Sequence, residues 1–167
     1  LPDERRKGEA MKLLIILFAA LMLALTARAE GKIEEVGAPG GITDWLVQEP
    51  SIPLMALELR FRGGASLDRP GKRGAVNLMT GLLEEGAGDL DSRAFSRAVE
   101  GLAASFGYAV GPDQLSVPAR FLSENRDDAV ALLRASLNEP RFDAVDFDRV
   151  REKVLTGIRS DQTDPDL

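Results

Sequence analysis

The sequence has 167 residues, a length that allows one modest domain or part of a larger one. Apolar residues make up 44% and charged residues 29%, the balance of a globular rather than a disordered chain. Cys and His both number 0, which excludes disulfides, cysteine nucleophiles, the Ser-His-Asp triad and every zinc site that needs thiolate or imidazole. The net charge of −6 argues against binding to nucleic acid or anionic membrane surfaces.

The first segment predicts export. Residues 1–10 precede a plausible start at Met11 and are interpreted as an upstream, non-native extension. Residues 11–29 are predicted to be a signal peptide, because an uncharged apolar run at 13–25 is followed by the small-x-small pattern of a cleavage site after Ala29. The mature protein is then expected in the periplasm without a stable membrane anchor. An uncleaved anchor is the alternative, although the run is shorter than the about 20 residues that span a bilayer.

The mature part is expected to begin with strands. Residues 30–41 are polar and glycine-rich and are predicted to be a linker, and 42–167 to be the folded domain, incomplete at its C-terminus. A short strand is expected at 45–47. Apolar and polar residues alternate from Met55 to Phe61, a period of two that predicts a half-buried strand.

Two helices are predicted next. The first covers residues 74–84 and is ended by the glycines that follow it. The second has apolar residues at the spacing of an amphipathic helix, namely Phe95, Ala98, Val99, Leu102, Ala103 and Phe106. Asp91 or Ser92 is expected to cap its start and Gly107 its end.

A hairpin and two more helices complete the pattern. The hairpin turns at 111–114, and Pro118 in its second strand indicates an edge or a bulge. Asn125 is expected to cap a helix that Pro140 stops, and Asp143 to open a last helix. The inner stripe of that last helix is predicted to be Phe147, Val150, Val154, Leu155 and Ile158. The order β-β-α-α-β-β-α-α predicts an α+β domain in which an antiparallel sheet is packed with helices.

Several short blocks, in this order, resemble one protein family. The blocks are Arg62-Gly63-Gly64-Ala65-Ser66 with Asp68, Pro70 and Gly71; Gly74-Ala75-Val76; Asn138-Glu139-Pro140-Arg141-Phe142; and the helix from Phe147 to Ile158. Over about 100 residues (63–165) they resemble the N-terminal half-domain of the M16 metallopeptidases, the insulinase and pitrilysin family. The resemblance implies the LuxS/processing-peptidase-like M16 fold.

The resemblance also locates a missing zinc site. Active members carry H-x-x-E-H on the first helix, where residues at i and i+4 share a face and bind one metal, and the Glu is the general base. Asn77, Thr80 and Gly81 occupy these three positions, and Gly157 occupies that of the third ligand, a glutamate on the last helix. No catalytic, cofactor-binding or metal residue is therefore assigned to this chain. The two glycines are expected to let the helices approach closely.

The implied function is that of a non-catalytic subunit. M16 proteins often work as pairs, so the resemblance implies a heterodimer in which a catalytic M16 partner holds zinc and this chain helps to enclose a peptide substrate. A stand-alone peptide-binding or scaffold protein with the M16 fold is a second possibility. An active metallopeptidase whose site lies outside these residues is a third. An acidic cluster at 84–91 is interpreted as a solvated helix end rather than a calcium loop, because it lacks the alternation of an EF-hand.

Overall fold

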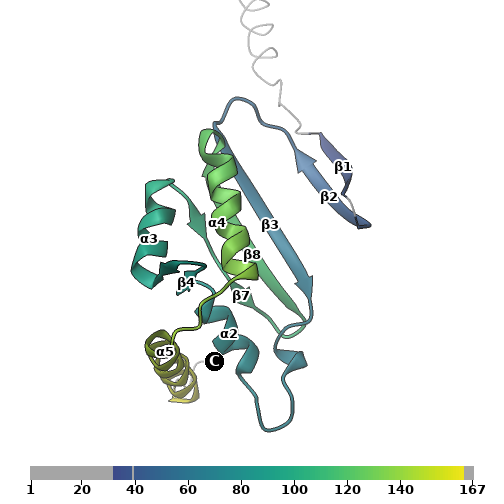
Figure 1. Ribbon diagram of the computed structural model, residues 1–167. Coiled ribbons are helices and arrows are strands. Elements are labelled where there is room, and N and C mark those ends of the chain that lie inside the picture. The colour runs from purple at the N-terminus through teal and green to yellow at the C-terminus, as the bar shows by residue number, and fades with distance from the viewer. Residues whose placement is uncertain (1–31, 39, 164–167) are drawn as a thin grey trace, which may run out of the picture. The chain divides into compact units, whose positions relative to one another are not determined.

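The computed structural model describes residues 32–38 and 40–163, which fall into two units, residues 1–51 and 52–167 (Figure 1). Each unit is described by itself. The predicted extension (1–10) and signal peptide (11–29) lie outside the described residues. Among the helices of the described part, none is both long and apolar enough to cross a membrane.

The first unit contains an antiparallel hairpin. Strand β1 (Ile33–Ala38) pairs with β2 (Ile42–Val47), and Ile33 lies opposite Val47. The stretch 30–41, expected to be a linker, thus contains a strand, and the strand expected at 45–47 begins earlier. Gly40 and Gly41 both have positive φ (94° and 79°), a conformation that glycine adopts readily and that reverses the chain. The reversal places Ala38 opposite Ile42, so β1 pairs with β2 along its whole length.

The sheet of the second unit has β8 at its centre. The long strand β3 (Leu54–Arg62) pairs antiparallel with β8 (Gln114–Leu122), and two short strands, β6 (Ser105–Phe106) and β7 (Ala109–Val110), pair with the other side of β8. The alternating pattern at 55–61 and the hairpin at 111–114 therefore predicted the right elements. The fold class, an α+β unit with antiparallel sheets, is confirmed.

Pro118 lies in the central strand and not at an edge. The backbone N–H of Gly107 donates to the Pro118 carbonyl at 2.9 Å, so the backbone groups of Pro118 face β6 and β7. Proline has no N–H to give to a neighbouring strand. Because this side of β8 is where β6 ends and β7 has not yet begun, the missing donor falls in the gap between two short strands. That gap explains how a central strand accommodates proline.

Helices cover the sheet and its end. They are α2 (Ala75–Leu82), α3 (Ser92–Gly101), α4 (Arg126–Asn138) and α5 (Ala144–Thr163), with single 3₁₀ turns η1 (Ala65–Leu67) and η2 (Ser123–Asn125), and a two-residue hairpin of β4 (Gly86–Ala87) and β5 (Leu90–Asp91). Helix α4 lies over the face of β3 and β8 (Figure 1). Residues of β8 and α4 form the core between them, namely Val117, Ala119, Phe121, Ala129 and Leu133.

Two helix ends differ from the sequence prediction. Helix α3 stops at Gly101, and Ala103 takes a positive φ of 48°, so Phe106 lies in a strand rather than on the helix stripe. Asp91 does cap α3, since its carboxylate accepts the N–H of Ala94 at 2.8 Å. Asn125 precedes α4 but its side chain makes no cap; its amide donates instead to the carbonyl of Leu102 at 2.9 Å. A tertiary contact replaces the local one.

Candidate functional site

Helix α2 is held in place from its N-terminus. The carboxylate of Asp68 accepts the N–H of Gly74 at 2.6 Å and that of Val76 at 3.0 Å. These are the donors that a helix start leaves without an intrahelical partner. A negative charge also favours the positive end of the helix dipole. The loop after β3 thus fixes the start of the helix that would carry the zinc motif in active M16 members.

The structure places the three motif positions of α2 in different surroundings. Asn77 is exposed, Thr80 is buried with 3% of its surface accessible, and Gly81 is half-buried. The Thr80 hydroxyl donates to the Val76 carbonyl at 2.8 Å, so it is engaged within its own helix. Gly157, the fourth position, is exposed on α5.

Helix α5 approaches α2 closely at Gly81. A Cβ built on Gly81 would lie 2.8 Å from Cγ1 of Val150, which is itself buried with 3% of its surface accessible. The expected close approach of the two helices is therefore confirmed at Gly81. It is wrong for Gly157, because a Cβ there would meet nothing within 4 Å. The residue opposite Gly81 is Val150, about two helical turns before Gly157.

This arrangement does not fit a zinc centre. Zinc in such a site needs imidazole or carboxylate donors that converge on one point. The two α2 positions for imidazoles hold an exposed amide and a glycine, and a valine methyl fills the space beside the glycine. Across residues 32–38 and 40–163, no group of three His, Cys, Asp or Glu side chains is arranged to hold a metal ion.

An ion-pair cluster joins the end of α2 to α5. Arg149 of α5 donates to both carboxylate oxygens of Glu85, at 2.9 and 2.5 Å, and to Asp146 at 2.7 Å. Ser92, the first residue of α3, donates to Glu85 at 2.7 Å. The hydrogen bonds from Arg149 lower the pKa of Glu85 and, with those to Asp146, raise the pKa of Arg149. The cluster favours the ionised form of Glu85 and ties α3 and α5 to the turn that follows α2.

Two further polar groups near these helices have a raised pKa, the exposed Glu84 and the half-buried Tyr108. Burial raises the pKa of Glu84, against an opposing effect from the charge of Lys153. Burial also raises the pKa of Tyr108, whose hydroxyl bonds to that of Ser136. Because Ser136 donates to the Leu133 carbonyl at 2.8 Å, Tyr108 is the donor to Ser136. No local pattern in the sequence indicates this bond, because the two residues are 28 positions apart.

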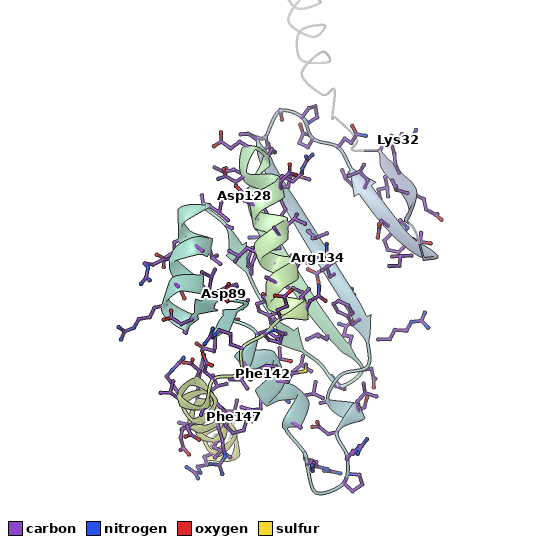
Figure 2. The ribbon with its side chains drawn as sticks, in the orientation of Figure 1. Lys32, Asp89, Asp128, Arg134, Phe142 and Phe147 are labelled. Atoms are coloured by element: carbon purple, nitrogen blue, oxygen red, sulfur yellow. The ribbon has the colours of Figure 1, made fainter. Side chains whose placement is uncertain are left out.

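An apolar groove opens between α4 and the sheet. Its volume is about 510 Å³, and its lining comes from β3, α2, β8 and α4: Leu57, Leu59, Phe61, Met79, Leu83, Leu115, Val130, Leu133, Arg134, Leu137 and Asn138. Arg134, labelled on α4 in Figure 2, is the charged member of the lining. Phe61 is 45% exposed and Val130 42%, so the groove is open to solvent in the described part of the chain.

Comparisons with known proteins agree with the fold. No protein-family model matches the sequence. The non-peptidase homolog YmxG of Helicobacter pylori (strain ATCC 700392 / 26695) is 26% identical over 159 residues, covering 93% of this chain and 35% of that protein. A crystal structure of a peptidase M16 inactive domain from Pseudomonas fluorescens is 26% identical, with a TM-score of 0.74 over 80% of this chain and 33% of that chain.

A crystal structure of a protease from Helicobacter pylori shares the fold, with a TM-score of 0.65 and 16% identity over 77% of this chain and 31% of that chain. The chain thus spans about a third of the length of the relatives it matches. Of the relatives described as inactive or non-peptidase, the Helicobacter homolog is similar to this chain in sequence, and the Pseudomonas domain is similar in both sequence and fold. Together with the order of the matching blocks, they show that the chain has the fold of an M16 half-domain and is similar to proteins described as inactive or non-peptidase.

Proposed function

We propose that this chain is part of a non-catalytic subunit of an exported M16 zinc-peptidase pair, in which it helps to complete the peptide-binding chamber of a catalytic partner. The observation that carries the proposal is the contact between Gly81 and Val150, because a valine methyl occupies the space where a second ligand to zinc would stand. The inactive Pseudomonas domain and the non-peptidase Helicobacter homolog support the non-catalytic role.

In this role the chain contributes enclosure and binding rather than bond cleavage. A wall that limits the motion of a bound peptide lowers the entropic cost of bringing the scissile bond to the partner's metal. Zinc and the general base would both belong to the catalytic subunit. Export rests on the signal pattern of residues 11–29, which predicts a periplasmic location.

The test compares the protein alone with the protein in its pair. The full-length mature protein is purified by itself and together with a co-encoded M16 protein that has an intact H-x-x-E-H. Zinc is measured by mass spectrometry and cleavage with a quenched peptide library. We expect the lone protein to be free of zinc and inert, and the pair to cleave. Replacing the motif glutamate of the partner with glutamine should abolish cleavage without separating the two subunits.

Two results would overturn the proposal. Stoichiometric zinc and cleavage by the lone protein would mean that an active site exists in it. Failure to associate with any M16 protein, with peptide binding retained, would favour a stand-alone peptide-binding protein of the same fold. N-terminal sequencing of the periplasmic fraction tests export separately, with a mature start at Glu30 as the expected result.

A further inference from the structure

The loop between β3 and α2 is a basic segment in an acidic chain. Residues 62–73 contain four basic side chains and one acidic side chain, a net charge of +3, whereas the whole chain carries −6. The exposed basic residues are Arg62, Arg69, Lys72 and Arg73. Within the part of the chain that the structure describes, none of them forms an ion pair. This cluster attracts anions locally, because charges farther away than about 8 Å are largely screened at physiological ionic strength.

Two acids belong to the loop or adjoin it, and neither neutralises the cluster. The carboxylate of Asp68 accepts the N–H groups of Gly74 and Val76, at 2.6 and 3.0 Å, so it is directed at the start of α2. Asp113 lies in the turn beside the loop, where its carbonyl accepts the N–H of Gly63 at 2.8 Å. Its carboxylate forms no ion pair among the described residues. The positive charge of the loop is therefore not balanced by its own surroundings.

Backbone hydrogen bonds hold the loop in one conformation. At its beginning, the N–H of Ala65 donates to the Gly111 carbonyl at 3.0 Å. Near its end, the N–H of Lys72 donates to the Arg69 carbonyl at 2.9 Å, which closes a tight turn. The loop extends past the end of β3 in the second unit (Figure 1). Because its backbone is already ordered, little conformational entropy is lost when a ligand binds to it.

The basic loop leads directly into the motif positions of α2. Arg73 precedes Asn77 by four residues, so their Cα atoms are at most about 14 Å apart. Asn77, the first of the motif positions, is exposed. An extended peptide rises about 3.4 Å per residue, so a segment of about five residues that contacts Asn77 can also reach Arg73.

We propose that the peptides bound by this chain are acidic, with glutamate or aspartate side chains that pair with the basic loop of residues 62–73. This proposal rests on the proposed function for the place where the peptide lies. Carboxylates suit the loop because guanidinium groups bind them through two parallel N–H donors. The position of the loop beside the motif positions favours a peptide over an anionic membrane surface, whose binding the net charge of −6 opposes.

The test measures peptide binding by the mature protein without a partner. The probe is an acetylated peptide of alternating glutamate, serine and leucine that carries a neutral fluorophore, and fluorescence anisotropy follows its binding. A peptide with glutamine in place of glutamate should bind about tenfold more weakly, because it cannot form the ion pairs. Added salt should weaken binding of the glutamate peptide more than binding of the glutamine peptide, since exposed charges are screened.

Paired variants assign the effect to the loop. Arg69→Gln combined with Arg73→Gln should weaken binding of the glutamate peptide about tenfold, because each exposed ion pair contributes about two- to fivefold. The matched control is Arg93→Gln combined with Arg97→Gln, since both arginines are exposed on α3 and the net charge changes equally. The control should bind within about twofold of the unmodified protein. Far-UV circular dichroism checks that both double variants keep the fold.

Three outcomes would overturn the inference. Equal affinity for the glutamate and glutamine peptides would show that charge does not select the ligand. Equal weakening in the two double variants would show that the net charge of the protein acts, and not the loop. Binding to phosphatidylglycerol vesicles that depends on Arg69 and Arg73, without binding of the glutamate peptide, would assign the loop to a membrane surface.

The assay of the pair separates this inference from the proposed function. If the pair assembles and cleaves glutamate and glutamine peptides equally well, the proposed function stands and the preference for acidic peptides is refuted. If no pair assembles but the lone protein binds the glutamate peptide through the loop, the proposed function is refuted and the acidic peptide class stands.

Discussion

Gly81 and Gly157 are two helical glycines in opposite surroundings, so the same substitution should change stability with opposite sign. A Cβ at Gly81 would lie 2.8 Å from Val150 Cγ1, and a Cβ at Gly157 would meet nothing within 4 Å. Alanine is a better helix former than glycine at both sites. The main difference between the two sites is that a neighbouring helix packs against Gly81 and not against Gly157.

The magnitudes follow from these two effects. Alanine in place of glycine within a helix is worth up to about 1 kcal/mol, so Gly157→Ala should raise the free energy of unfolding by about 0.5–1 kcal/mol. At Gly81 the same gain is opposed by overpacking, which costs about 1–3 kcal/mol. Val150 cannot easily move aside, because a β-branched side chain in a helix is held in one rotamer and this one is buried. Gly81→Ala should therefore lower stability by about 1 kcal/mol.

Urea unfolding followed by far-UV circular dichroism measures both variants in the full chain. In a Val150→Ala background the clash is removed, so Gly81→Ala should become neutral or stabilising. The coupling between Gly81 and Val150 in this double-mutant cycle is then about 1–2 kcal/mol. If Gly81→Ala is as stabilising as Gly157→Ala, the helices do not touch at Gly81. Val150 would then not occupy the space of a ligand at this position.

Three other changes test particular contacts. Arg149→Met should lower the free energy of unfolding by about 1 kcal/mol at pH 7. The effect is no larger because Arg149 is half exposed, so solvent screens its ion pairs. Because the pKa of Glu85 is lowered in the folded protein, this contribution to stability is present above the ordinary carboxyl pKa and is lost as the pH falls through the folded-state value. A difference in unfolding free energy between the unmodified chain and Arg149→Met that stays constant from pH 7 to about pH 3 would contradict this. Tyr108→Phe should cost about 1 kcal/mol and add little to Ser136→Ala, whereas full additivity in urea unfolding would mean that their bond contributes nothing. Asp68→Ala should lower the stability of the first turn of α2 by about 1–2 kcal/mol, which hydrogen exchange measures as faster exchange of its amides. Asp68→Asn should keep part of this stability, because its side-chain oxygen can still accept a hydrogen bond. Equal losses in the two variants would show that the side-chain acceptor does not stabilise the helix start.

Elements with a strong local period were predictable from the sequence. The alternation at 55–61 and the stripe that begins at Phe95 gave the right strand and helix because each repeats over several residues. The end of α3 was not predictable in this way. Leu102, Ala103 and Phe106 continue the helical spacing, yet Phe106 lies in β6, paired with Ala119 of β8. That partner is distant in sequence, so no local pattern records it.

The site was predictable as a set of missing ligands but not as a packing arrangement. The identities of Asn77, Thr80 and Gly81 already remove the donors, and spacing along α2 places them. The pairing of Gly81 with Val150 and not Gly157 depends on where the two helices cross, which sequence spacing does not specify. Within the predicted inner stripe of α5, Val150 is buried whereas Phe147 is 39% exposed.

The placement of the aromatic side chains gives the chain two separate optical probes. Its one tryptophan, Trp45, lies on β2 and is 80% exposed. Its one tyrosine, Tyr108, is hydrogen-bonded inside the second unit. Tryptophan emission therefore reports on the hairpin, and a shift to shorter wavelength would signal that something has covered β2. Tyrosine absorbance reports on the α4–sheet core, so one sample at two wavelengths can distinguish docking at the first unit from unfolding of the second.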